Sequence, residues 1–225
     1  MKSKGFFITL EGIDGAGKTI QVGRLVRYLR KRGHKVRATR EPGGTAIGEK
    51  IRAILMSQKS DLSPLAELVL FYAARAQHLE EVIRPALERG ELVVSDRFND
   101  CSFVYQGYAR ALGSRKVRLL DRAICGETQP DLTLVLDLDP RAALERALAR
   151  DRRWRAGSSR FEAAGHDFQK KARAGYRVLA RREPHRVRLI RADRPADEVE
   201  AEIRQVVEDR VKSSSQKSGV RIQKR

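Results

Sequence analysis

A glycine-rich loop between an apolar run and an amphipathic stretch constrains the fold of this chain more than any other feature. The run Phe6-Phe7-Ile8-Thr9-Leu10-Glu11 is rich in β-forming residues, and residues 21–32 carry apolar side chains at helical spacing. Between them, residues 12–19 read GIDGAGKT and fit the pattern G-x-x-x-x-G-K-T. Strand, loop and helix in this order are what a phosphate-binding loop requires, so the sequence predicts a nucleotide site here.

The residue types in this loop suit a phosphate group. Glycines let the backbone turn with its N–H groups pointing inward, at a helix N-terminus whose dipole favours an anion. We expect Lys18 to reach the β- and γ-phosphates and the Thr19 hydroxyl to ligate Mg²⁺. The expected nucleotide-binding residues are Gly12, Ile13, Asp14, Gly15, Ala16, Gly17, Lys18 and Thr19. The loop predicts a bound nucleotide but does not specify the reaction.

Apolar runs that alternate with helical patterns predict the rest of the fold. Further strands are expected at Lys35–Arg40, Leu92–Asp96, Leu132–Asp137 and Val187–Ile190. Helices are expected at 46–57, 64–87, 114–125, 140–150, 167–181 and 196–211, the second of them kinked before Pro85. This alternation implies a doubly wound α/β fold, with roughly five parallel strands, helices on both faces, and ligands at the carboxyl ends of the strands.

The net charge of +18, with a pI near 10.5, raises nucleic-acid binding as a hypothesis. Two segments carry much of this charge: Lys212–Arg225 has five basic residues and no acid, and residues 141–160 have seven arginines against two acids. No zinc-finger spacing or RNA-binding aromatic signature accompanies them, so only nonspecific contact by the tail is expected. Residues 212–225 are predicted to be a disordered basic tail because residues 213–219 show no periodicity.

Length and composition favour one domain over residues 1–211. The chain has 225 residues, of which 41% are hydrophobic, and no apolar run approaches the length of a membrane span. Residues 1–4 lead directly into a strand rather than forming a signal peptide, so a cytoplasmic protein is expected. Cys101 and Cys125 lack C-x-x-C spacing and the four histidines are scattered, which predicts reduced core thiols and no zinc site.

Charged residues follow the third and fourth predicted strands. Asp96 ends one strand and Arg97 follows it, so a carboxylate that could hold the metal and a guanidinium that could grip a phosphate emerge at the ligand edge. Asp137 and Asp139 follow the next strand and are weaker candidates. Because Asp139 precedes Pro140, it is expected to be a helix N-cap.

Four motifs in order make this chain resemble bacterial thymidylate kinases, P-loop kinases of nucleoside monophosphates, from Phe7 to about Val211. They are LEGIDGAGKT (10–19), REPGGT (40–45), FYAARAQH (71–78) and DRF (96–98), the last followed by Ser102 and by YQG (105–107). The resemblance implies transfer of a phosphoryl group from MgATP to dTMP, giving ADP and dTDP for dTTP synthesis, by a homodimer. No general base is needed, because the acceptor phosphate is already an oxyanion, so positioning and charge neutralisation dominate.

The resemblance also implies roles for individual residues. Phe71 would stack on the thymine ring, and Arg75, one helical turn later, would donate to a base carbonyl. Ser102 would hydrogen-bond the base N3, Tyr105 would close against the sugar 2′ position, and Gln106 lies in the same wall. Arg97, with Arg40 as a further contact, would hold the acceptor phosphate, while Asp14 would contact the sugar 3′-hydroxyl or the metal shell.

A mobile lid at about residues 150–162 is implied as the source of a catalytic arginine, because the loop itself contains none. The candidates are Arg150, Arg152, Arg153, Arg155 and Arg160, of which Arg153 and Arg150 are favoured. Two positions depart from the family pattern. Ile20 stands where a hydroxyl residue is common, and Ser159 stands where an Asp usually precedes Arg-Phe-Glu.

Three alternatives remain open at the level of sequence. A kinase for another pyrimidine nucleoside monophosphate (dUMP, UMP or CMP) would share most of these motifs. A P-loop switch or motor would hydrolyse a nucleotide to drive a partner, but the guanine motif N-K-x-D is absent and Asp96-Arg97 is not a D-x-x-G switch. A nucleic-acid binder would rely on the basic tail.

Overall fold

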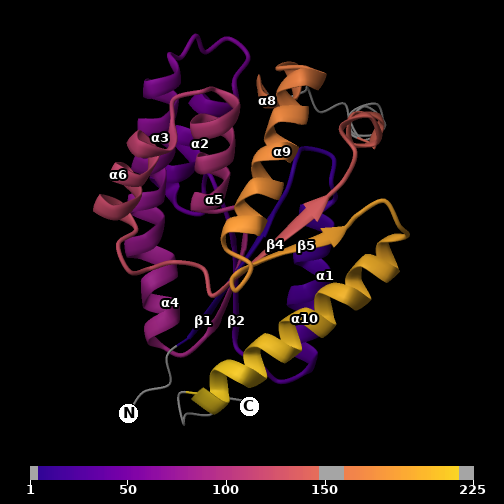
Figure 1. Cartoon of the computed structure of the whole chain (residues 1–225). Coiled ribbons are helices and arrows are strands. Elements are labelled where there is room, and N and C mark those ends of the chain that lie inside the picture. The colour runs from indigo at the N-terminus through magenta and orange to yellow at the C-terminus, as the bar shows by residue number, and fades with distance from the viewer. Residues whose placement is uncertain (1–4, 147–159, 218–225) are drawn as a thin grey trace.

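A five-stranded parallel sheet forms the centre of the molecule, which we describe from a computed structural model over residues 5–146 and 160–217 (Figure 1). The strands are β1 (Phe6–Glu11), β2 (Val36–Arg40), β3 (Leu92–Asp96), β4 (Leu132–Asp137) and β5 (Val187–Arg191). Their order is β2-β3-β1-β4-β5, and every neighbouring pair is parallel. The predicted doubly wound fold is confirmed, with the phosphate-loop strand β1 at the centre of the sheet.

Helices cover both faces of the sheet. They are α1 (Lys18–Lys31), α2 (Ala46–Met56), α3 (Pro64–His78), α4 (Arg84–Glu88), α5 (Asn99–Ser102), α6 (Ser114–Ile124), α8 (Arg160–Ala163), α9 (His166–Arg182) and α10 (Ala196–Lys217). Residues 140–146 are also helical, and the predicted remainder of that helix to residue 150 lies outside the described residues. Figure 1 shows α1 and α10 together on one side of the sheet, and α3, α4 and α6 on the other.

The central strand β1 divides the core between these two layers. Its residues Phe6, Ile8 and Leu10 pack in the cluster that includes α1 and α10, while Phe7 packs against side chains of α3, α4 and α6. Successive side chains of a strand point to opposite faces, so a continuous apolar strand is what a sheet covered on both sides requires. Both cysteines, Cys101 and Cys125, are buried free thiols, as predicted.

The predicted long helix at 64–87 is interrupted by a π-helical turn, η1 (Leu79–Ile83), between α3 and α4. Pro85 follows directly in the first turn of α4. Proline has no N–H and its ring crowds the carbonyl four residues earlier, so a regular α-helix cannot pass through it without adjustment. The expected disturbance is present, as a wider turn that precedes Pro85.

Three helical segments were not predicted or were predicted too short. The segment after β3 forms α5 and a second π-helical turn, η2 (Phe103–Ala109), and α8 lies after the fourth strand. The last helix continues six residues beyond Val211 to Lys217, so residues 213–217 are helical where a structureless tail was expected. Residues 218–225 lie outside the described residues. Over the described chain, no helix combines the length and apolar character needed to cross a membrane.

Candidate active site

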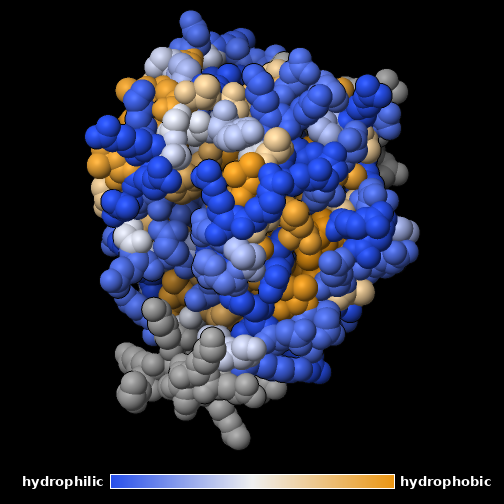
Figure 2. Space-filling model, viewed as in Figure 1, coloured by the Kyte–Doolittle hydropathy of each residue, from blue (hydrophilic) through white to orange (hydrophobic). Residues whose placement is uncertain are grey.

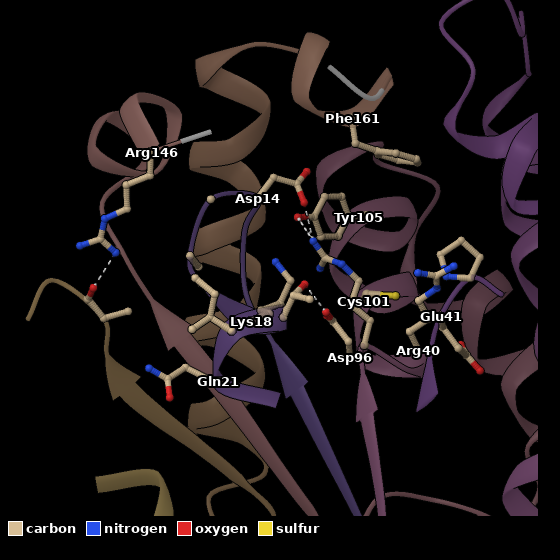
Figure 3. Close-up of a pocket in the computed structure, with 18 of the residues that line it drawn as sticks. Asp14, Lys18, Gln21, Arg40, Glu41, Asp96, Cys101, Tyr105, Arg146 and Phe161 are labelled. Carbon is tan, nitrogen blue, oxygen red and sulfur yellow. Dashed lines mark hydrogen bonds and ion pairs between the residues drawn. The ribbon is translucent and has the colours of Figure 1, made fainter. Parts of the chain in front are cut away.

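One pocket of about 1160 Å³ lies at the carboxyl ends of the strands. Most of the predicted site residues line it: Asp14, Gly15, Ala16, Gly17, Lys18, Thr19, Arg40, Phe71, Asp96, Arg97, Tyr105 and Gln106. Figure 3 shows Arg146 at one end of this pocket, Phe161 and Glu41 toward the other, and Lys18 between them. A single elongated pocket with the phosphate loop in its middle can accommodate a ligand on each side of the loop.

The phosphate loop packs closely against the end of β4 and the helical segment that follows it. Gly12 and Gly15 have φ angles of +136° and +81°, which side chains disfavour. A Cβ at Gly12 would lie 2.7 Å from the carbonyl oxygen of Leu136, and one at Gly15 would lie 2.0 Å from that of Ala143. Gly17, at φ +92°, precedes α1 and has no atom near the corresponding Cβ position. Glycine is therefore needed at these positions for backbone conformation, and at two of them also for space.

Lys18 and Thr19 begin α1 with their side chains at the loop. Lys18 is buried and its Nζ donates to the carbonyl oxygen of Ile13 at 2.8 Å, so the ammonium lies across the loop. Burial, together with the positive charge of Arg97, lowers the pKa of Lys18 to about 8. The Thr19 hydroxyl donates to Asp96 Oδ2 at 2.6 Å. These two oxygen ligands beside the loop fit Mg²⁺, which binds few protein groups and keeps water and phosphate oxygens.

Arg97 is held at the centre of the pocket by its neighbours. Its backbone has a φ of +70°, and its guanidinium donates to the carbonyl oxygen of Gly12 at 2.9 Å and to Asp14 Oδ1 at 2.7 Å. The guanidinium also lies over the Tyr105 ring, 5.1 Å from the centroid. Although burial opposes ionisation of Asp14, the charges of Arg97 and Lys18 lower its pKa below the ordinary value. Asp14 is therefore an anion that fixes Arg97 in place beside the phosphate loop.

Aromatic side chains form the wall of the pocket beyond Arg97. The Phe71 ring is 5.8 Å from that of Phe161, which in turn is 5.9 Å from that of Tyr105, both pairs edge to face. All three residues are buried and line the pocket. Phe161 was not predicted as a site residue, although it belongs to the Arg-Phe-Glu segment noted in the sequence. The wall offers flat apolar surfaces of the kind that bind a planar ring.

Arg75 and Ser102 lie behind this wall and do not line the pocket. The Arg75 guanidinium is fully buried and donates to Glu41 Oε2 at 2.7 Å, to Ser102 Oγ at 3.2 Å and to the carbonyl oxygen of Phe98 at 3.0 Å. Ser102 is also fully buried. These contacts connect the β2–α2 loop, α3 and the segment after β3. The predicted contacts of Arg75 and Ser102 with a base stay predictions.

Gln106 lines the pocket and has one unused polar atom. Its amide nitrogen donates to Glu67 Oε1 at 2.8 Å, whereas its carbonyl oxygen is buried and has no hydrogen-bond partner among the described residues. A buried polar atom without a partner is uncommon in folded proteins and often marks a place where a ligand or water binds. Gln106 is thus better placed than Ser102 to accept a hydrogen bond from a bound base.

Of the arginines proposed for the lid, only Arg160 is among the described residues. Its guanidinium donates to Glu67 Oε2 at 2.6 Å and to the carbonyl oxygen of Leu55 at 3.3 Å, and it does not line the pocket. Arg160 therefore anchors α8 to α3. Arg150, Arg152, Arg153 and Arg155 lie outside the described residues, so their roles stay predictions.

The acidic residues after β4 have structural partners. Asp139 Oδ1 accepts from the backbone N–H of Arg141 at 3.0 Å at the start of the helical segment 140–146, which confirms the predicted N-cap. Asp137 is paired with Arg173 and Arg177, with an N–O distance of 2.7 Å to each. Neither carboxylate lines the pocket.

Three arginines in the pocket were missed from the sequence: Arg52, Arg146 and Arg194. Arg52, on α2, donates to the carbonyl oxygen of Pro42 at 2.8 Å, and Arg146 donates to that of Ala192 at 3.0 Å. Nothing in their local sequence distinguishes them from the other arginines of this basic chain. Only the folding of α2, of the helical segment 140–146 and of the segment after β5 toward the loop brings them to the pocket.

Comparison with known proteins agrees with the motifs. Residues 10–203 match the family model described as thymidylate kinase. The chain is 47% identical to a thymidylate kinase of Desulfovibrio desulfuricans over 207 residues, covering 90% of this chain and 94% of that protein. It is 45% identical to one of Deinococcus radiodurans over 208 residues, covering 92% and 98%.

A solved structure gives the same result for the fold. The crystal structure of thymidylate kinase from Ehrlichia chaffeensis superposes with a TM-score of 0.73 at 30% identity, covering 91% of this chain and 99% of that one. Family model, sequence relatives and fold agree over the strands and loops that form the pocket. This chain belongs to the thymidylate kinase family.

Proposed function

We propose that this protein transfers the γ-phosphoryl group of ATP, bound with Mg²⁺, to dTMP, giving ADP and dTDP. Thymidylate kinases phosphorylate dTMP, and nothing in the comparisons favours another monophosphate. The observation that supports the proposal is that Arg97, bound by Asp14 of the phosphate loop, lines the same pocket as the loop and the aromatic wall. This guanidinium would bind the acceptor phosphate, with the donor nucleotide at the loop and the base at the aromatic wall.

The donor would be held by the loop and by the end of the pocket near Arg146. The loop amides and Lys18 would hold the β- and γ-phosphates, and the nucleoside would extend toward Arg146 and Arg194. Thr19 and Asp96 would hold Mg²⁺, which when bound neutralises charge on the phosphates. Displacing Lys18 Nζ from the carbonyl oxygen of Ile13 would free the ammonium for this contact.

The acceptor would lie between Arg97 and the aromatic wall. Arg97 is already oriented by Asp14, so its guanidinium can bind the dTMP phosphate without first being ordered. Phe71 would stack on the base and Tyr105 would close against the sugar. The carbonyl oxygen of Gln106, which has no partner within residues 5–146 and 160–217, would accept from the base N3–H. Arg40, whose guanidinium is half exposed and paired with Glu49, would be a further phosphate contact.

The decisive experiment is the release of ADP from MgATP in the presence of dTMP, dUMP, UMP, CMP or no acceptor. We expect dTMP to give the highest kcat/KM. A rate with dTMP no greater than with ATP alone would contradict the proposal. The variant Lys18→Ala should lose at least about a hundredfold in kcat while retaining its far-UV spectrum and melting temperature, since it removes a transition-state contact rather than core packing.

We also propose a homodimer formed through α2, α3 and α6. Apolar side chains on these helices are 46–70% exposed: Ile47, Ile54, Leu65, Val69 and Leu119. Figure 2 shows apolar surface along the side on which these helices lie in Figure 1. An exposed apolar patch of this kind is typical of a protein interface. Light scattering that reports a monomer at micromolar concentration would contradict this assignment.

A further inference from the structure

Glu67 is a fully buried acidic residue on α3 that does not line the pocket. Its carboxylate accepts hydrogen bonds from three side chains: Gln106 at 2.8 Å, Arg110 at 3.2 Å and Arg160 at 2.6 Å. Two of these partners are guanidiniums, which have donors but no acceptor, and both form ion pairs with the carboxylate. An ionised carboxylate has no proton to donate, so each of these bonds must be donated to it.

This constraint fixes the orientation of the Gln106 side-chain amide. An amide has a donor side and an acceptor side, and only its NH₂ group can face a carboxylate. The Gln106 carbonyl oxygen must therefore lie on the side away from Glu67, and it is the atom that lacks a partner among the described residues. Turning the amide over would place two acceptors in contact and would leave a buried donor unpaired, so the orientation is strongly held.

We propose that Glu67 is a positioning residue that makes the acceptor site selective for bases with an N3–H, which are thymine and uracil, against cytosine. This inference rests on the proposed contact between Gln106 and the base. Thymine and uracil donate from N3, whereas cytosine has a lone pair there and would face the oxygen of Gln106, acceptor to acceptor. Selectivity against cytosine would thus be set by a carboxylate that never touches the nucleotide.

The test replaces Glu67 by its neutral isostere. In Glu67→Gln the two amides can pair in either sense, so the orientation of Gln106 is no longer fixed. We expect the ratio of kcat/KM for dTMP to kcat/KM for dCMP to fall about tenfold to a hundredfold, chiefly through a higher KM for dTMP. The KM for ATP should stay within about twofold, because the donor contacts lie elsewhere in the pocket.

Arg110→Gln is the matched control. Arg110 is also bound to Glu67 but makes no hydrogen bond to Gln106, and the carboxylate keeps its ion pair with Arg160 without it. This variant removes an ion pair from the same carboxylate and should leave the dTMP to dCMP ratio unchanged. A ratio that falls equally in both variants would mean that general damage to the site, rather than amide orientation, is responsible, and would overturn the inference.

The double variant Glu67→Gln/Gln106→Glu supplies an independent test. The carboxylate and the amide then exchange places, and the new carboxylate accepts from the amide with one oxygen while its other oxygen remains an acceptor for N3–H. The dTMP to dCMP ratio should recover to within about threefold of the native value. If Glu67→Gln alone fails to fold, this double variant still decides the matter, because a low ratio in the folded double variant contradicts the inference.

The variant Gln106→Leu separates this inference from the proposed function. An unchanged dTMP to dCMP ratio in Gln106→Leu would show that Gln106 does not contact the base. The inference would then be wrong, while the proposed kinase activity would be unaffected. A reduced ratio in Gln106→Leu together with a native ratio in Glu67→Gln would refute only the positioning role of Glu67. Failure of the proposed function would instead appear in the native protein, as no stimulation by dTMP.

Discussion

Two glycines of the phosphate loop allow backbone strain to be separated from close packing. Gly15 and Gly17 have similar φ angles, +81° and +92°, so alanine at either position meets a similar conformational cost of about 1–2 kcal/mol. Of these two glycines, only Gly15 would bring the added Cβ into collision, at 2.0 Å from the carbonyl oxygen of Ala143, whereas at Gly17 no neighbouring atom of the described residues lies within 4 Å of it. Gly17→Ala is thus a matched control for Gly15→Ala.

The collision at Gly15 can be relieved only by moving backbone, because the obstructing atom belongs to the helical segment 140–146. Forcing extra volume into a packed region costs about 1–3 kcal/mol. Gly15→Ala should therefore lower the free energy of unfolding by about 2–5 kcal/mol and Gly17→Ala by about 1–2 kcal/mol. The entropy that alanine removes from the unfolded chain is the same in both variants and cancels in the comparison.

Urea unfolding of the two variants measures the difference between their free energies of unfolding. Equal m-values would verify that the unfolded state is the same in both. At about 2–4 °C per kcal/mol for a chain of this size, melting temperatures should separate in the same order. Gly15→Ala should also raise the KM for ATP more than Gly17→Ala, because the displaced loop carries the phosphate-binding amides. Equal free energies of unfolding for the two variants would refute the close contact between the loop and residue 143.

Two further predictions concern buried charges. Burial and the charge of Arg97 lower the pKa of Lys18 in the free enzyme to about 8, and only the protonated ammonium binds phosphate. The kcat/KM for ATP should therefore fall as pH rises through about 8, while kcat should stay level to higher pH. A kcat/KM that is flat from pH 7 to 10 would contradict this. Arg75→Ala should lower the free energy of unfolding by about 3–5 kcal/mol in urea titration, because the buried Glu41 carboxylate would lose its guanidinium partner and keep only its contact with His78. The double variant Glu41→Gln/Arg75→Met should recover most of that loss. Equal instability of the single and double variants would show that the ion pair is not responsible.

Much of the fold could be predicted because local signals agree with one another. The three central strands, β1, β3 and β4, were located to the residue, since a strand buried on both faces is a continuous apolar run. Segments without such a pattern were missed. The π-helical turn η2 contains three aromatic residues, one glycine and a buried glutamine in no regular spacing, and it packs against α9. The last turns of α10 were missed because serines usually favour helix ends, whereas here the Ser213 hydroxyl donates to the carbonyl oxygen of Asp209 and the helix continues.

For the candidate site, too, local motifs could be predicted and contacts between distant segments could not. The sequence by itself determined the phosphate loop and the Thr19–Asp96 pair, because a motif of fixed spacing places its own backbone and strand ends meet at one edge of a parallel sheet. The aromatic Phe71 followed from the resemblance to the family, and it lines the pocket. Only the tertiary structure decided that Arg75 and Ser102 lie behind the pocket wall, and that the carbonyl oxygen of Gln106 has no hydrogen-bond partner in the described part of the chain. The orientation of a buried polar side chain depends on hydrogen-bond partners that are distant in the sequence, and these partners cannot be predicted from the spacing of residues along the chain.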